Sequence, residues 1–403
     1  MDHLRKPPSK MIDSGACPTS LPTGRSTLRR SMIGITGVML AITAACGRPP
    51  ASPLTSRVII GVTATSNEPG RSLTNNERKA LRAAIDTDSG SAELHLGGSD
   101  PPTPVDLRLR RGVETEHDPD RRAQMSAQRQ NAINTKLGQA NGTNGRLDLL
   151  GVISEISRQP GPATIYLHSS GLNTTDPLDL RKIDWDTDPS AVVRNLTKQG
   201  FIPDLHGKIL YFAGLGDTTG RQPSLAPPLR NKIITLWMKI CQASGAKCRV
   251  DTEPTTGRSV STTPVPVVAV ESFPTIPMPR SGHKAVIQLP ATLLFGPDSA
   301  VLLPGAADQL RPLARLLAAG DTATLVGHTA TWSTPEGARK FSLARAQAVA
   351  RSLIALGAPA RSITSITGVG FDQQLVPDRD TAGHLIPEPA SRNRRVEVTI
   401  TAP

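Results

Sequence analysis

The sequence predicts a doubly wound α/β fold over residues 57–252, because short apolar runs alternate there with segments of helical periodicity. Wholly apolar runs of this length suit strands that are buried on both faces of a parallel sheet. A stretch rich in Pro, Thr and Ser, residues 253–283, follows and is typical of an extended linker. Residues 284–403 return to strand and helix patterns, which indicates a second folded region.

Each element expected in the first region follows from its own pattern. The runs VIIGV and ILYF are apolar enough for central strands, and helices are expected where apolar residues recur three and four positions apart. The expected strands are residues 58–62, 92–96, 105–109, 163–168, 208–212 and 248–252. The expected helices are residues 75–85, 119–139, 147–156, 191–199 and 229–241. This alternation is what a sheet with helices on both faces requires.

The second region carries separate helix and strand signals. Pro304 suits the first turn of a helix whose apolar stripe reaches Leu317. Thr334 followed by Pro335 is typical of an N-cap, and we expect the helix that begins there to run to Gly357. The expected strands are residues 285–287, 323–326, 362–370 and 395–400.

The composition narrows the possible partners. The chain has 403 residues and a formal net charge of +12, which favours anionic surroundings such as phospholipid or anionic wall polymers. Aromatic residues make up only 3% of the chain, and they do not interleave with the basic residues. Because nucleic-acid-binding surfaces usually stack bases on aromatic rings, nucleic acid is not an expected partner.

The N-terminal residues indicate export. Residues 1–31 are polar and basic, and the apolar run 32–45 is too short for a comfortable membrane span but suits the core of a signal peptide. Small residues immediately before Cys46 resemble a bacterial lipobox, which implies a signal peptide over residues 1–46, lipidation of Cys46 and a tether over residues 47–56. The alternative is an ordinary secretory signal in which Cys46 has no special role.

The remaining cysteines outside this leader are Cys241 and Cys248. A helix is expected to end at Cys241 and a strand to begin at Cys248, with Gly245 between them. The turn brings the two thiols toward each other, and exported proteins commonly oxidise such pairs. We therefore expect a disulfide, with two small buried thiols as the alternative.

Four short motifs follow one another along the second region. They are LFGPDSA at residues 294–300, VGHT at 326–329, LARA at 343–346 and NRRVEV at 393–398. In this order and spacing they resemble the OmpA-like peptidoglycan-binding domain. The resemblance implies a two-layer α+β sandwich over residues 284–403 that attaches an envelope protein to the cell wall without catalysis.

The resemblance also implies a binding site. In that family an Asp after Gly-His-Thr binds the ammonium group of diaminopimelate, and an Arg fifteen residues later binds its carboxylate. Here the Arg is Arg345, but Ala330 stands at the Asp position. The lost charged hydrogen bond is worth about 1.5–3 kcal/mol. We hypothesise that Glu336 supplies a substitute carboxylate.

Further positions of the site come from the same resemblance. Thr329 offers a hydroxyl, and Phe295 and Asp298 line the rim of the pocket in relatives. His328 follows a buried strand and is expected to be structural rather than a ligand or a base. The Arg pair at residues 394–395 is expected to fix the last strand to the neighbouring helix.

The first region faintly resembles the von Willebrand factor A (vWA) fold, whose members bind a divalent metal through carboxylates after two strands. The corresponding segments here, residues 63–66 and 168–171, read TATS and HSSG and contain no Asp. Because divalent metals prefer carboxylate oxygens, we predict no metal and no other cofactor. A hydrolase that uses Ser169 or Ser170 beside His168 is disfavoured because no nucleophile-elbow motif is present, so no catalytic residue is assigned.

An acidic loop, residues 172–189, follows a predicted strand and contains five Asp residues and Trp185. Ligand sites in α/β folds lie at this end of a strand, although a solvated surface loop is the simpler interpretation. Trp185 is alternatively an anchor for a protein contact.

The sequence thus predicts a secreted, lipid-anchored protein of the cell envelope that is not an enzyme. Its expected partners are peptidoglycan, the membrane through Cys46, and an unknown protein bound by the vWA-like region. The alternative is an OmpA-like fold that does not bind the wall and acts as a structural or protein-interaction module.

Overall fold

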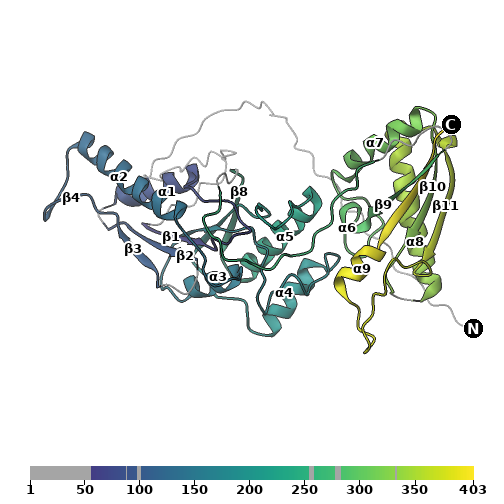
Figure 1. Ribbon diagram of the computed structural model, residues 1–403. Helices are drawn as coiled ribbons and strands as arrows, with labels where there is room; N and C mark the ends of the chain where they lie inside the picture. Colours follow the sequence, from purple (N-terminus) through teal and green to yellow (C-terminus); the bar gives the residue numbers. More distant parts are fainter. Residues whose placement is uncertain (1–55, 88, 98–100, 254–257, 277–282, 332–333) are drawn as a thin grey trace, which may run out of the picture. The chain divides into compact units, whose positions relative to one another are not determined.

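The computed structural model describes residues 56–87, 89–97, 101–253, 258–276, 283–331 and 334–403 (Figure 1). The predicted signal peptide and Cys46 lie outside these residues. Residues 53–403 form one compact unit, which contains both folded regions. No helix in the described part of the chain is long and apolar enough to cross a membrane.

The first region contains a six-stranded sheet of order β3-β2-β1-β6-β7-β8. Neighbouring strands from β2 to β8 run parallel, and the edge strand β3 is antiparallel to β2. The strands are β1 (Arg57–Val62), β2 (Ser91–Leu96), β3 (Thr103–Asp106), β6 (Thr164–His168), β7 (Ile209–Ala213) and β8 (Lys247–Asp251). A small hairpin of β4 (Arg110–Arg111) and β5 (Glu114–Thr115) was not expected. The mixed α/β architecture is the predicted one.

Strand β1 is buried on both sides, as its wholly apolar sequence requires. Val58, Ile60 and Val62 join one core with Leu81 of the first helix. Ile59 joins the core on the other face. The helices are α1 (Asn75–Ile85), α2 (Pro119–Gly138), α3 (Leu149–Ser157), α4 (Pro189–Lys198) and α5 (Pro227–Ala243). Two separate apolar layers against one strand explain why a simple alternating pattern is absent from this sequence.

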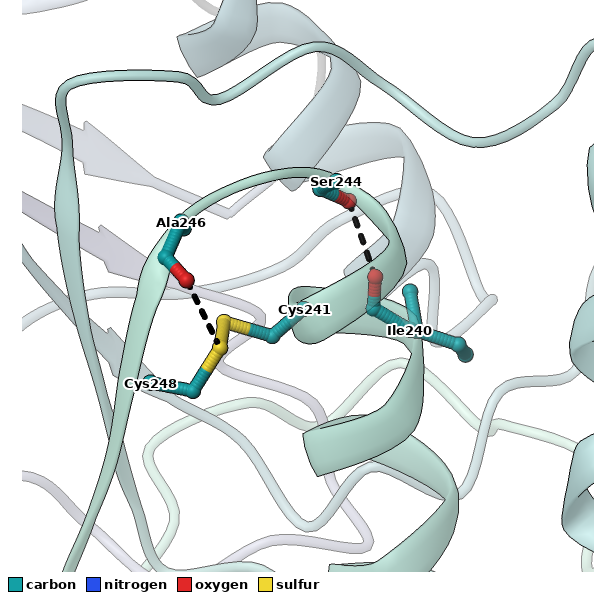
Figure 2. Close-up of a disulfide and its surroundings, with 5 residues drawn as sticks. All are labelled: Ile240, Cys241, Ser244, Ala246 and Cys248. Carbon is teal, nitrogen blue, oxygen red and sulfur yellow. Dashed lines mark hydrogen bonds between the residues drawn. A yellow bond between two sulfur atoms is a disulfide. The ribbon is translucent and has the colours of Figure 1, made fainter.

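A disulfide joins Cys241 near the end of α5 to Cys248 in β8 (Figure 2). The two Cα atoms are 6.1 Å apart, a normal separation for bridged cysteines. Gly245 allows the tight turn between them because its φ of 78° lies in the left-handed region that favours glycine. The pair expected from the sequence is therefore joined.

The segment interpreted as an extended linker packs against the first region. The side-chain amide of Gln222 accepts a hydrogen bond from the backbone N–H of Val268 and donates one to its carbonyl, each at 2.9 Å. Val265 and Val268 are buried, and the Ser259 hydroxyl donates to the carbonyl of Thr65 at 2.9 Å. Residues 267–270 form no regular secondary structure. This segment covers the carboxyl edge of the sheet.

The second region is a four-stranded sheet of order β11-β10-β12-β9 packed against helices. Strands β10 and β11 are parallel, and the other neighbours are antiparallel. The strands are β9 (Lys284–Pro290), β10 (Thr322–His328), β11 (Ile363–Gly370) and β12 (Arg395–Thr401). The helices are α6 (Ala291–Leu294), α7 (Ala306–Ala318), α8 (Pro335–Ala355), the 3-10 helix η1 (Ala360–Ser362) and α9 (Pro387–Asn393). Pro387 begins α9, in keeping with the preference of Pro for a first helical turn.

Reducing the disulfide should lower the stability of the first region. The loop that it closes is short, seven residues in sequence separation, so chain entropy predicts a loss of about 2–3 kcal/mol in the free energy of unfolding. Urea denaturation with and without dithiothreitol measures this loss. The Cys241→Ser/Cys248→Ser variant is the control and should be insensitive to the reductant. Equal stability of the wild type in both conditions would contradict the prediction.

Candidate functional site

Arg345 lies in the middle of α8, and its side chain is held from three sides. The residue is only 2% exposed. Its Nε donates a hydrogen bond of 2.9 Å to the carbonyl of Ser299. The guanidinium carbon lies 4.4 Å from the ring centre of Phe341 and 5.2 Å from that of Phe295. The rings and the carbonyl therefore fix the direction of the guanidinium.

One donor of this guanidinium is unsatisfied. The Nη1 atom of Arg345 is buried and has no hydrogen-bond partner among the described residues. Burial lowers the pKa of Arg345, and the negative charge of Asp186 is the largest influence that opposes this shift. Leaving a buried charged donor unpaired is costly, by about 1–3 kcal/mol or more. The side chain is thus oriented and lacks one acceptor.

Three other predicted site residues lie in this region. Phe295 is fully buried beneath Arg345, whereas Asp298 is exposed and close enough to act electrostatically on it. Asp298 has a φ of 46°, which is uncommon for a residue other than glycine. Thr329 is 3% exposed, and its hydroxyl has no partner in the part of the chain described. The structure brings Phe295 and Asp298 together with Arg345.

Glu336 lies away from Arg345. It is exposed in the first turn of α8, nine residues before Arg345. Nine residues correspond to about 13 Å along a helix and to the opposite helical face. The two side chains therefore cannot bind the two ends of one small zwitterion, and the substitute carboxylate hypothesised from the sequence is not supported. Ala330, at the usual Asp position, is buried.

A different carboxylate lies next to Ala330. Asp378 accepts hydrogen bonds from the backbone N–H of Thr331 at 2.8 Å and from its hydroxyl at 2.6 Å. Asn393 donates to the same carboxylate at 3.1 Å. Burial raises the pKa of Asp378, but these hydrogen bonds outweigh it and the net pKa is lowered. Sequence reasoning missed Asp378 because no motif connects it to Thr331, 47 residues away.

The two arginines at 394–395 have different roles. Arg395 lies 3.6 Å from Glu397 and bonds backbone carbonyls, as expected for a residue that fixes the last strand. Arg394 instead forms ion pairs with Asp184 and Asp186, with 2.6 Å between its Nε and the Asp186 carboxylate. These acids belong to the loop over residues 172–189.

In the first region, polar groups at the ends of β1 and β6 converge on one buried carboxylate. Glu68 accepts hydrogen bonds from the hydroxyls of Thr63, Thr65 and Ser169 at 2.7–3.0 Å. The Nη2 atom of Arg71 lies 3.5 Å from the same carboxylate, and both side chains are buried. Burial raises the pKa of Glu68, yet Arg71 and the hydrogen bonds reverse this, so the net shift is downward.

The partners of this carboxylate are hydroxyl groups and one arginine. Within the described residues, no group of three potential metal-binding side chains is present. His168 contacts Glu77 at 2.6 Å rather than a serine hydroxyl. Ser169 bonds Glu68, so the two groups of the disfavoured hydrolase face different partners. The arrangement closes the carboxyl edge of the sheet with internal hydrogen bonds.

Comparison with known proteins gives one family. Residues 294–384 match the OmpA family. The structural matches include the cell wall anchor of the T6SS from Pseudomonas aeruginosa, at 26% identity and a TM-score of 0.26, covering 30% of this chain and 82% of that one. The peptidoglycan-associated lipoprotein from Burkholderia pseudomallei matches at 22% identity and a TM-score of 0.24, and the match covers 27% of this chain and 88% of that one. The periplasmic domain of Helicobacter pylori MotB matches at 17% identity and a TM-score of 0.26, and the match covers 30% of this chain and 79% of that one. No curated protein matches this chain.

Removing the charge of Glu68 should destabilise the first region strongly. The Glu68→Gln variant leaves Arg71 buried without a compensating charge, and the expected cost is about 3–5 kcal/mol in the free energy of unfolding. Urea denaturation measures it. Glu336→Gln, on the exposed surface, is the control and should change stability by less than about 0.5 kcal/mol. A loss below 1 kcal/mol for Glu68→Gln would refute the internal role.

Acid should destabilise the second region through His328. This residue is 1% exposed, and burial together with the charge of Arg395 lowers its pKa from 6.5 to about 4. The contribution of neutral His328 to stability is therefore fully present above pH 6.5. About 3 kcal/mol of the free energy of unfolding is lost as the pH falls from 6.5 through 4. Unfolding free energies at pH 7.5, 6, 5 and 4 should fall less steeply for His328→Gln than for the wild type. Parallel pH profiles would contradict the assignment.

Proposed function

We propose that this chain is a peptidoglycan-associated protein of the cell envelope, in which Arg345 binds a carboxylate of the wall's stem peptide. The OmpA family match over residues 294–384 supports the class of function. The observation that carries the proposal is the buried, oriented guanidinium of Arg345 with its unpaired Nη1. A carboxylate is the natural acceptor because it can accept two parallel bonds from a guanidinium.

The surroundings of Arg345 favour a strong interaction with a small anionic group. Exclusion of water lowers the local dielectric, which strengthens a charged hydrogen bond. Phe295 and Phe341 restrict the guanidinium, so little side-chain entropy remains to be lost on binding. With Ala330 in place of an acid, the site is proposed to recognise mainly the carboxylate end of a zwitterion.

The second candidate is a protein-interaction module that does not bind the wall. The ion pairs between Arg394 and the acidic residues at 184 and 186 favour it, because in them an arginine of this region binds carboxylates of the protein itself. The presence of Ala330, where the resemblance implies an acid, also favours this candidate. The two candidates differ in whether isolated wall material binds.

Cys46 and the first region also have proposed roles. Cys46 is proposed as a lipid anchor on the basis of the lipobox resemblance, and such an anchor would hold the protein at the membrane outside the cytoplasm. The first region is proposed to be a vWA-like module that presents a surface to another protein and binds no metal. The guanidinium of Arg71 beside Glu68 supports the second point, since a cationic side chain already balances the buried carboxylate.

A sacculus pull-down tests the wall proposal. Arg345→Met removes the guanidinium but retains apolar packing between the two rings, and it should weaken binding to purified sacculi about 10- to 150-fold. Arg351→Met, at an exposed position of the same helix, is the matched control and should bind like the wild type. Equal binding by the Arg345 variant and the wild type would exclude the proposed role of Arg345, and wild-type protein that fails to bind sacculi under all conditions would favour the second candidate.

A further inference from the structure

The helices α1 and α2 lie side by side in the first region (Figure 1), and a groove of about 670 Å³ opens between them. Arg78 and Arg82 of α1 line it, together with Arg122 of α2 and His117 just before that helix. Among the described residues that line the groove, Asp86 is the one acid. Three arginines against one aspartate leave the lining with a net charge of +2 when His117 is neutral.

The packing of α2 explains why the groove is open and polar. Ile133 and Leu137, toward the end of the helix, join the apolar core beneath α1. Farther back along α2 the buried residues are Ser126 and Gln130, and the amide of Gln130 donates to the hydroxyl of Ser126 at 3.4 Å. The two helices therefore close over an apolar contact at one end only. Elsewhere the groove offers polar groups and positive charge, which suit a polar anion.

The arginines of the groove are oriented but not neutralised. Arg122 donates from Nη1 to the carbonyl of Glu116 at 2.8 Å, and Arg78 donates from Nη2 to the side-chain oxygen of Asn134 at 3.5 Å. Each bond uses one of the five N–H donors of a guanidinium group. Arg82 is exposed, and none of the three arginines forms an ion pair with another described residue. Most of their donors thus remain available to a ligand.

The chemistry and size of the groove indicate a phosphate-bearing ligand. Guanidinium groups bind phosphate oxygens through paired N–H donors, and several of them together compensate its charge. The volume of the groove is in the range of sites that hold a small organic molecule, so it exceeds what one inorganic ion needs. A phosphate that is attached to a larger polar group fits both properties.

The groove opens near the point where the chain enters the first region. The N–H of Ser91 donates to the carbonyl of Ser56 at 3.0 Å, and Asp86 at one end of the groove is five residues before Ser91. Cys46 is ten residues before Ser56, a stretch that spans at most about 35 Å when fully extended. An anchor at Cys46 would therefore keep this end of the groove within reach of a bilayer. For this placement alone, the inference rests on the anchor proposed above.

We propose that the groove between α1 and α2 binds the phosphate of an anionic phospholipid headgroup, with Arg78, Arg82 and Arg122 as its ligands. This contact holds the first region at the membrane surface, whereas Arg345 is proposed to act on the wall. An arginine close to an anionic membrane surface strengthens binding about fivefold. Three of them together supply a factor of about 100.

Binding of the full-length chain to vesicles tests the proposal. On vesicles of phosphatidylcholine and phosphatidylglycerol in equal parts, Arg78→Gln/Arg82→Gln/Arg122→Gln should bind at least about 20-fold more weakly than the wild type. On phosphatidylcholine alone the two proteins should bind equally. The single variant Arg82→Gln removes a side chain with no ion pair among the described residues, so it should fold normally and bind about fivefold more weakly.

A matched control removes the same charge elsewhere in the first region. Arg194→Gln/Arg221→Gln/Arg249→Gln changes three exposed positions outside the groove, and it should weaken binding less than about threefold. Equal losses in the two triple variants would show that only the overall charge matters and would overturn the site. Groove variants that bind like the wild type would overturn it as well.

Protection of Arg82 from phenylglyoxal, mapped by mass spectrometry, distinguishes the sources of phosphate. Phosphatidylglycerol vesicles should protect Arg82, whereas inorganic phosphate at a matched concentration should not. Equal protection by inorganic phosphate would overturn the headgroup assignment in favour of a free anion. Weaker binding of the groove variant to purified sacculi would overturn it in favour of a wall polymer.

The proposed function is tested separately from the groove. Added vesicles measure the groove whether or not Cys46 is lipidated, and palmitate labelling with a Cys46→Ala control decides the anchor. Sacculus binding that Arg345→Met abolishes and the groove variant retains supports both proposals. Vesicle binding that depends on the groove, in a protein that fails to bind sacculi, would overturn the wall proposal and leave the lipid site standing.

Discussion

Burying a guanidinium away from water is the constraint on which both regions of this protein depend. Such a group is stable only when charges and acceptors replace its hydration. Arg71 has a carboxylate 3.5 Å away in Glu68, although none of its three guanidinium nitrogens has a hydrogen-bond acceptor among the described residues. Arg345 does not meet this requirement among its own neighbours, since it has one carbonyl acceptor and two aromatic rings but no paired carboxylate. The difference between the two arginines is therefore the nearby carboxylate, which Arg71 has and Arg345 lacks among the described residues.

The carboxyl edge of the first sheet illustrates the structural case. The position where ligands enter a doubly wound fold lies between β1 and β6. Here Glu68 and three hydroxyls satisfy one another at that position, and the segment containing Val265 and Val268 packs over the edge. These polar groups therefore have partners within the protein. The acidic loop contacts the linker through the hydrogen bond of Trp185 to Ala269, and it contacts the second region through the ion pair of Asp184 with Arg394.

Much of the fold follows from local patterns. The parallel strands, their alternating helices and the bridged cysteines were expected because periodicity and short spacing report on neighbours in the chain. The linker interpretation was incomplete for a physical reason. Val265 and Val268 lie among prolines and show no period, so nothing in the local sequence indicates that a partner such as Gln222 buries them.

The sequence by itself determined that Arg345 stands on a helix, where the resemblance to OmpA-like domains implies carboxylate binding, and that Ala330 stands where the same resemblance implies an acid. The tertiary structure decided which acids come near. Asp186 acts electrostatically on Arg345, and Asp184 pairs with Arg394 from 210 residues away. Chain spacing reports contacts within a turn, a helix or a hairpin, whereas electrostatic pairing between distant segments depends on how sheets and loops pack. That is why the arginine was predictable and its carboxylate neighbours were not.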